Sequence, residues 1–236
     1  GADRMTFNNL NVVGTGATYA YVCLLSAGAD YNTFSACTFS CPLNGTSTSH
    51  YPVIFSGINS GVSNTNSGNY DTFLNCTMSN GWYGIYMYGL TAVPYQTNNT
   101  IQGCTVQDFN YMGVYCYYQK NPSLIRNTVE RPTRTSSYTS TTYGMYVYYT
   151  QGTVVDGNRV QKIYEGMQTT TNTTYGIYFY YNSVGSGANR NMLRNNIVCD
   201  LKSNGTIYGM YGYYFDGGIY HNTISIDHTG STATGI

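Results

Sequence analysis

Apolar and polar side chains alternate in a short phrase that the chain repeats five times. Each copy begins with Gly, has Tyr at the second and fourth positions after it, and has apolar or small residues at the first and third. The copies are residues 84–88, 113–117, 144–148, 176–180 and 209–213. Successive side chains of a strand point to opposite faces. Each copy therefore predicts one β-strand with an apolar inner side and two outward tyrosines.

The outward positions form a candidate binding face, because tyrosine is apolar and can also form hydrogen bonds. These positions hold Tyr86, Tyr88, Tyr115, Tyr117, Tyr146, Tyr148, Tyr178, Tyr180, Tyr211 and Tyr213. Further tyrosines flank each phrase, at Tyr83, Tyr143, Tyr175, Tyr208, Tyr118, Tyr149, Tyr181 and Tyr214. The rows also have a purely structural interpretation, since tyrosine favours strands and like aromatic rings stack along parallel strands.

A second phrase lies between the tyrosine phrases, with Cys or Asn between two apolar positions. It occurs eight times if residues 7–12, with Leu10 at the central position, are included. The other central residues are Cys37, Cys76, Cys104, Asn127, Asn158, Asn196 and Asn222. We expect a structural ladder here, because an inward bend leaves backbone groups without partners and stacked amides can bond to one another. The cysteines fill the same place as small buried residues.

The spacing of the phrases predicts the fold. The five glycines lie 29 to 33 residues apart, without helical periodicity between them, which is typical of a parallel β-solenoid. We expect a single all-β domain over residues 1–236, with about eight turns and an inner column that contains Ile85, Val114 and Met145. Neither end carries an obvious polar cap, so we expect a segment of a longer chain, or ends covered by a partner.

Both phrases resemble the right-handed parallel β-helix proteins of the pectate-lyase-like superfamily, over nearly the whole chain. Residues 173–177 and 221–225 are also similar to long secreted surface proteins of the Bacteroidetes type. Many superfamily members cut acidic polysaccharides, and the resemblance implies a substrate groove on an outer strand face and its flanking loops. A lyase there requires a basic residue and carboxylates for Ca²⁺, and a hydrolase requires clustered acids.

The outward positions of the tyrosine phrases contain no acid and no base, so we predict no catalytic residue on this face. Asp216 lies three residues after the last phrase and is the nearest acid. A column four places after the Cys or Asn residue contains Asp108, Arg131, Lys162 and Asp200. We expect these four side chains to be exposed cross-rung pairs, each of little energetic weight.

Composition narrows the possible partners. The net charge is 0 and only 8% of the residues are charged, which argues against nucleic acid. No apolar stretch approaches the ~20 residues of a membrane helix. The seven cysteines form no Cys-x-x-Cys pair and accompany no His cluster, so we expect buried thiols, no metal and no cofactor. Abundant Ser, Thr, Asn and Gly favour an extracellular location.

The sequence therefore predicts a non-catalytic extracellular structural or adhesive module, whose outer tyrosines contact a glycan or a protein. Self-assembly, or continuation at both solenoid ends as in a fibre or stalk, is a related hypothesis. The alternative is a polysaccharide lyase or glycoside hydrolase that acts on acidic polysaccharide. Polar insertions such as residues 131–142 and 164–174 are further candidates for recognition.

Overall fold

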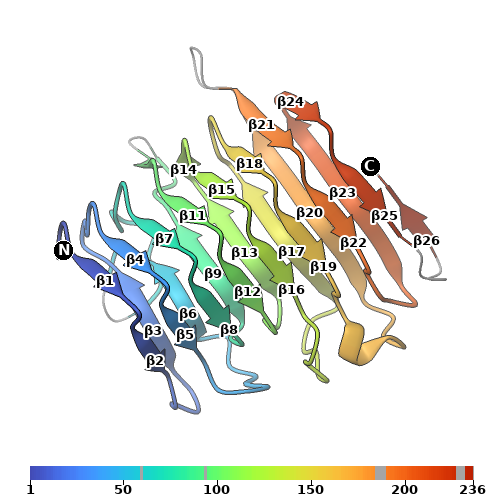
Figure 1. Cartoon of the computed structure of the whole chain (residues 1–236), viewed down its shortest axis with the longest axis horizontal. Helices are drawn as coiled ribbons and strands as arrows, with labels where there is room; N and C mark the ends of the chain where they lie inside the picture. The colour runs from blue at the N-terminus through green and yellow to red at the C-terminus, as the bar shows by residue number, and fades with distance from the viewer. Residues whose placement is uncertain (59–60, 93–94, 184–189, 227–231, 236) are drawn as a thin grey trace.

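The computed structural model describes residues 1–58, 61–92, 95–183, 190–226 and 232–235. Within these ranges the chain forms three eight-stranded parallel sheets, one two-stranded sheet and one short 3-10 helix. Each turn contributes one strand to each large sheet, so eight rungs stack along one axis (Figure 1). These eight stacked rungs make about seven full turns of the solenoid. The predicted all-β, right-handed parallel β-helix is confirmed.

Sheets A and B consist of short strands. Sheet A contains β1 (Thr6–Asn8), β4 (Thr33–Ser35), β7 (Thr72–Leu74), β11 (Thr100–Gln102), β15 (Ser123–Ile125), β18 (Val154–Asp156), β21 (Asn191–Arg194) and β24 (Gly217–Tyr220). Sheet B contains β2 (Asn11–Val13), β5 (Thr38–Ser40), β8 (Thr77–Ser79), β12 (Thr105–Gln107), β16 (Thr128–Glu130), β19 (Arg159–Gln161), β22 (Ile197–Cys199) and β25 (Thr223–Ser225). The second phrase of the sequence spans the corner between these two sheets.

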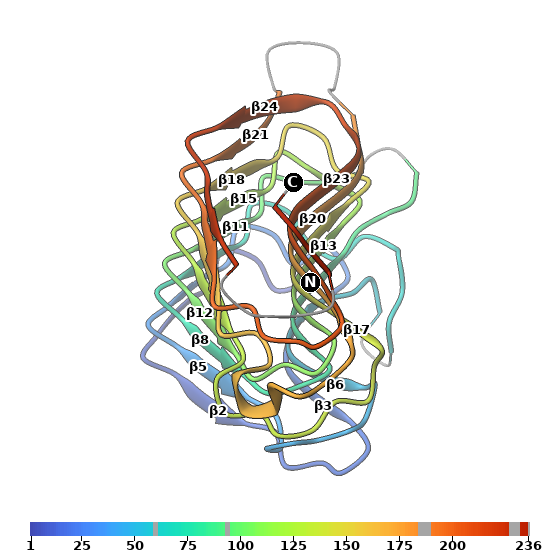
Figure 2. The ribbon, with the colours of Figure 1, turned by 90° about the vertical axis from the view of Figure 1, so that its right-hand side faces the viewer.

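Sheet C contains the longer strands and faces sheets A and B across the core (Figure 2). Its strands are β3 (Ala20–Leu25), β6 (His50–Phe55), β9 (Tyr83–Tyr88), β13 (Met112–Tyr117), β17 (Thr141–Tyr148), β20 (Thr173–Asn182), β23 (Thr206–Phe215) and β26 (Thr232–Thr234). The remaining elements are β10 (Gln96–Thr97), β14 (Gln119–Lys120) and the 3-10 helix η1 (Glu165–Met167). The tyrosine phrases are therefore the strands β9, β13, β17, β20 and β23.

Columns of apolar side chains fill the space between the sheets. Ile85, Val114 and Met145 are fully buried, so the predicted inner column is confirmed. Phe34 stacks on Phe7 and Phe73 at ring-centroid distances of 4.9 and 4.6 Å. The core is thus a set of in-register columns, and each rung buries the inner face of its neighbours.

A close approach between sheets B and C explains why each tyrosine phrase begins with glycine. A Cβ atom on Gly144 would lie 2.3 Å from Val160 Cγ1 and 2.6 Å from the carbonyl oxygen of Gly176. A Cβ atom on Gly113 or on Gly176 would likewise lie 2.4 Å from Cγ1 of the equivalent valine, Val129 or Val198. Only a residue without a side chain allows the tyrosine strand to pack this closely against sheet B.

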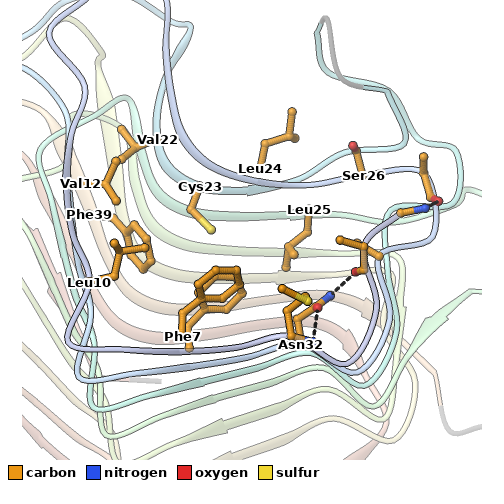
Figure 3. A pocket seen from close by; sticks show the side chains of 16 residues that line it. Phe7, Leu10, Val12, Val22, Cys23, Leu24, Leu25, Ser26, Asn32 and Phe39 are labelled. Carbon is orange, nitrogen blue, oxygen red and sulfur yellow. Dashed lines mark hydrogen bonds between the residues drawn. The ribbon is translucent and has the colours of Figure 1, made fainter.

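An apolar cavity of about 380 Å³ lies at the first rung (Figure 3). Inner side chains such as Phe7, Val12 and Leu25 line it, together with the thiol of Cys23. Burial raises the pKa of that thiol, so it stays protonated. The cavity has the chemistry of the core, and the candidate site lies elsewhere, on the outer side of sheet C.

Candidate functional site

The ten predicted tyrosines form two columns on the outer side of sheet C. The first column consists of Tyr86, Tyr115, Tyr146, Tyr178 and Tyr211, and the second of Tyr88, Tyr117, Tyr148, Tyr180 and Tyr213. We call these ten side chains the tyrosine face. Val114 and Cys116, which alternate with the tyrosines of β13, are fully buried, so the tyrosines occupy the opposite side of the strand.

The rings of the tyrosine face pack against one another in two directions. Along the axis, Tyr115 lies 5.0 Å from Tyr86 and 5.2 Å from Tyr146 between ring centroids, with planes 11° and 15° apart. Within one rung, Tyr115 and Tyr117 are 5.5 Å apart with an interplanar angle of 25°. Neighbouring rings thus cover much of each ring face. What remains exposed is mainly the outer edge with its hydroxyl group, because side chains stand roughly perpendicular to a sheet.

The exposure of the face increases toward the later rungs. Tyr86 is 8% exposed, whereas Tyr213 is 41% exposed. The packing also changes there, since Tyr178 and Tyr211 meet edge to face at 70°. The accessible part of the tyrosine face therefore extends from Tyr88 at the end of β9 over β13, β17, β20 and β23.

The tyrosine face is uncharged. Burial raises the pKa of Tyr115, Tyr146 and Tyr178, and neighbouring phenol groups raise it further, because a phenolate would be poorly solvated and would repel others. These three groups are therefore neutral phenols at physiological pH. A neutral phenol both donates and accepts hydrogen bonds, but it is a poor general base.

Two further columns of tyrosine widen the face. Tyr143, Tyr175 and Tyr208 stack at 4.9 and 4.6 Å along its first edge. Along the other edge lie Tyr118, Tyr149, Tyr181 and Tyr214. These last four residues all have left-handed backbone conformations with φ between 49° and 51°. Left-handed residues also recur at the corner between sheets A and B, so this conformation belongs to the corners of the fold.

The asparagines of the second phrase form a continuous hydrogen-bonded column. The Nδ2 atom of Asn158 donates to Asn196 Oδ1 at 3.0 Å and to the carbonyl oxygen of Leu124 at 2.8 Å. Its Oδ1 atom accepts from the backbone N–H and the side chain of Asn127, at 2.9 and 3.0 Å. Asn196 bonds to Asn222 in the same way. These amides satisfy backbone groups that the inward bend leaves free.

The cysteines occupy the same column with weaker versions of the same bonds. The Sγ atom of Cys104 donates to the carbonyl oxygen of Phe73 at 3.5 Å and accepts from the backbone N–H of Cys76 at 3.4 Å. Cys37 and Cys76 donate to the preceding rung likewise. All three are buried free thiols. Both residue types thus serve the corner, and neither exposes a reactive group.

A second polar column, which the sequence pattern did not reveal, lies where sheet C returns to sheet A. Asp71 Oδ1 accepts from the backbone and the side chain of Asn32 at 2.8 and 3.0 Å. Its Oδ2 atom is buried without a hydrogen-bond partner among the described residues. Burial raises the pKa of Asp71 to about 7, against the hydrogen bonds from Asn32, which lower it. The signal in the sequence is a single Asp at the position that Asn32 and Asn99 occupy in the neighbouring rungs.

The expectation of exposed charges after the second phrase was wrong for Asp108 and Arg131, which are 5% and 0% exposed. The insertion 131–142 folds back onto the bend between sheets B and C. There Asp108 accepts from the backbone N–H groups of Thr133 and Arg134, and Arg131 lies over the ring of Tyr164, 4.4 Å from its centroid. Arg134 is also fully buried and donates to the carbonyl oxygen of Gly45 at 2.8 Å. These charged groups hold the insertion in place.

Asp216 lies at the edge of the widened face, beside a cavity of about 400 Å³ that Tyr149, Tyr181 and Tyr214 also line. Its side chain is exposed. Among the described residues, no group of three or more His, Cys, Asp or Glu side chains is placed to hold a metal ion. Nor is any helix in the described part of the chain long and apolar enough to cross a membrane.

Comparison with known proteins supports the architecture. The sequence matches the family described as "Right handed beta helix region" over residues 1–225. A search of curated proteins gives no match.

Comparison with solved structures finds three similar chains. Two are of PfbA, a surface adhesin of Streptococcus pneumoniae, with TM-scores of 0.50 and 0.52 at 12% and 10% identity. These alignments cover 98% and 96% of this chain but 67% and 60% of the adhesin chains. The A-module of the Azotobacter vinelandii mannuronan C-5 epimerase AlgE6 has a TM-score of 0.39 at 13% identity, over 97% of this chain and 58% of that one. At 12% and 10% identity the likeness to PfbA concerns the fold alone.

Proposed function

This chain belongs to the right-handed β-helix family, and we propose that it is a non-catalytic extracellular module that adheres to a glycan or a protein through its tyrosine face. The observation that carries the proposal is the register of the ten tyrosines in two outer columns over five rungs. A rigid solenoid places these side chains at fixed spacing, so a ligand meets a surface that needs little ordering.

Three further observations support a binding role. The tyrosine face combines aromatic area with hydroxyl groups, as protein contact surfaces commonly do. The chain has few charged residues, so hydrogen bonding and apolar contact provide its recognition chemistry. The adhesin PfbA, to which the fold is similar, is a surface protein. Its partners and full activity are properties of that longer protein.

Two matched triple variants test the proposal. The face variant replaces three central tyrosines with serine: Tyr146, Tyr148 and Tyr178. The control variant replaces three exposed tyrosines of other surfaces with serine: Tyr31, Tyr70 and Tyr220. We expect the face variant to lose adhesion to immobilised glycans and to cell surfaces, and the control variant to retain it. Circular dichroism and a thermal melt establish that both are folded. Equal adhesion of a folded face variant and the wild type would remove the tyrosine face from the function.

One observation favours the second candidate, a lyase or hydrolase of acidic polysaccharide. Asp216 is an exposed acid beside a tyrosine-lined cavity of about 400 Å³, which is large enough for a sugar unit. Incubation with polymers of uronic acids, with and without Ca²⁺, separates the candidates. Chain cleavage that is lost in Asp216→Ala would support the enzyme. Binding of a polymer that stays intact would support the adhesive module.

A further inference from the structure

The way in which the tyrosines pack limits how they can contact a ligand. Sugars often bind aromatic side chains through the flat face of a ring, but neighbouring tyrosines 4.8 to 5.2 Å away already cover the ring faces of Tyr115 and Tyr146. A ligand that approaches the central rungs from solvent therefore meets ring edges and hydroxyl groups. Direct stacking on a ring face is largely blocked there.

The hydroxyl groups of the central rungs are available. Among the residues that the structure describes, those of Tyr115, Tyr146 and Tyr178 form no intramolecular hydrogen bond, and none of them is a buried unpaired atom. They therefore reach solvent, where each can donate one hydrogen bond and accept others. Because they repeat on every rung, they form a row of equivalent polar groups.

The lack of charge on the tyrosine face indicates what kind of polysaccharide can bind to it. No Lys, Arg, Asp or Glu occupies a position in the two columns of the tyrosine face. Burial also keeps the phenols of Tyr115 and Tyr146 neutral by raising their pKa. Carboxylate groups bind best to cationic partners such as Arg and Lys, which this face lacks. A polymer rich in neutral hydroxyl groups matches it better than a polyuronate does.

The period of the face indicates the shape and orientation of the ligand. Rungs repeat at about 4.8 Å, and successive sugar rings in an extended β-linked chain are separated by a similar distance. A linear chain parallel to the solenoid axis would thus place one sugar over the tyrosine hydroxyl groups of each rung. A chain laid across the axis would meet only the few tyrosines of one or two rungs.

We propose that the ligand of the tyrosine face is a neutral, linear polysaccharide that lies along the solenoid axis and is held by phenol hydroxyl groups, about one sugar per rung. This inference rests on the proposed function of the same face. It predicts that affinity increases with chain length until the oligosaccharide spans the accessible rungs.

Removal of the hydroxyls alone provides the test. The phenylalanine variant replaces Tyr146, Tyr148 and Tyr178 with phenylalanine, which keeps ring packing, and it is compared with the serine face variant. Calorimetric titrations use cellohexaose, xylohexaose and mannohexaose, their trimers, and hexamers of galacturonate and mannuronate. We expect the wild type to bind at least one neutral hexamer more tightly than its trimer, and to bind neither uronate. The phenylalanine variant should lose about tenfold or more in affinity, since several hydrogen bonds disappear together.

Other outcomes overturn the inference and separate it from the proposed function. If the phenylalanine variant binds like the wild type while the serine variant does not, the face binds through its rings and the hydroxyl hypothesis is wrong. Binding of uronates only overturns the neutral charge of the ligand, and binding of a protein or of a second copy of the chain instead overturns the polysaccharide class. If the serine variant loses that binding, the face remains the contact surface. The absence of binding to every oligosaccharide also overturns the inference. Unchanged binding by both folded variants would overturn both proposals.

Discussion

At the scale of single residues, one corner of the solenoid accepts two side chains with different chemistry. Asn158 and Cys104 both donate to a carbonyl group of the preceding rung and accept a backbone N–H group, although the cysteine bonds are 3.4 to 3.5 Å long. The corner requires a small group that donates and accepts at once. The asparagine amide forms the stronger hydrogen bonds. The cysteine thiol forms weaker ones, but its burial costs less desolvation energy.

This interpretation predicts which of two variants at Asn158 is the less stable. Asn158→Ala leaves the backbone N–H of Asn127 and the carbonyl oxygen of Leu124 without partners, so we expect a loss of about 2–4 kcal/mol in the free energy of unfolding. Asn158→Cys should lose clearly less, because the thiol can form both bonds. Urea denaturation measures the difference. Equal losses would mean that the column stabilises the fold by packing alone.

Asp71 makes the stability of the fold depend on pH. Asn32 and Asn99, its neighbours in the column, each donate an amide hydrogen to a carbonyl group of the preceding rung, at 2.9 and 3.1 Å. The corresponding atom in Asp71 is Oδ2, which can donate only when the carboxyl group is protonated. The pKa of Asp71 is raised by burial to about 7, so the neutral form persists in the folded state at mildly acidic pH.

The sign of the effect follows from linkage. The pKa in the folded protein lies above the ordinary value of 3.8, so the stabilising contribution is complete below pH about 4 and is lost as the pH rises through about 7. We expect Asp71→Asn to stabilise the protein at pH 8 by roughly 2–4 kcal/mol, and much less at pH 4.5. Urea denaturation at the two pH values checks this. A variant effect independent of pH would show that Asp71 does not change its protonation state in the folded protein between these two pH values, which contradicts a pKa of about 7.

At the scale of elements, the glycine at the start of each tyrosine strand sets the distance between sheets B and C. Gly144→Ala places a methyl group 2.3 Å from Val160 Cγ1, and backbone oxygen atoms prevent an easy shift. We expect a loss of about 1–3 kcal/mol. Gly212→Ala is the matched control, because its Cβ would lie 3.5 Å from the nearest atom, an ordinary contact. Thermal melts should separate the two, and similar midpoints would exclude the steric explanation.

The strands were predictable from the sequence where a regular pattern acts, and only there. The period of two placed Ile85 and Val114 inside, because one buried face of a strand imposes alternation. Corner insertions carry no such period, so the burial of Arg131 and Arg134 depends on how residues 131–142 fold back. The protonated state expected for Asp71 depends on its burial between rungs. The similarity of short phrases to long secreted surface proteins, and the roles of the tyrosine face and the ladder, remain predictions.

At the scale of the whole molecule, stacking turns a modest local motif into an extended surface. One tyrosine phrase offers two side chains, but the in-register stacking of β9, β13, β17, β20 and β23 turns ten of them into one surface. Such a surface can bind a repeating ligand through many weak contacts at once, which raises the overall affinity. Its cost in ordering is small, because the sheet already fixes the side chains.

Chemical footprinting of the hydroxyl groups tests the role of the tyrosine face most directly. The protein, alone or bound to whichever neutral polysaccharide it retains on an affinity column, is treated with N-acetylimidazole, and each acetylated tyrosine is located by mass spectrometry. We predict that the bound polymer protects Tyr115, Tyr146 and Tyr178, and leaves Tyr31 and Tyr220 as reactive as in the free protein. Equal acetylation of the central tyrosines with and without the polymer, or protection only at Tyr31 and Tyr220, would contradict this role.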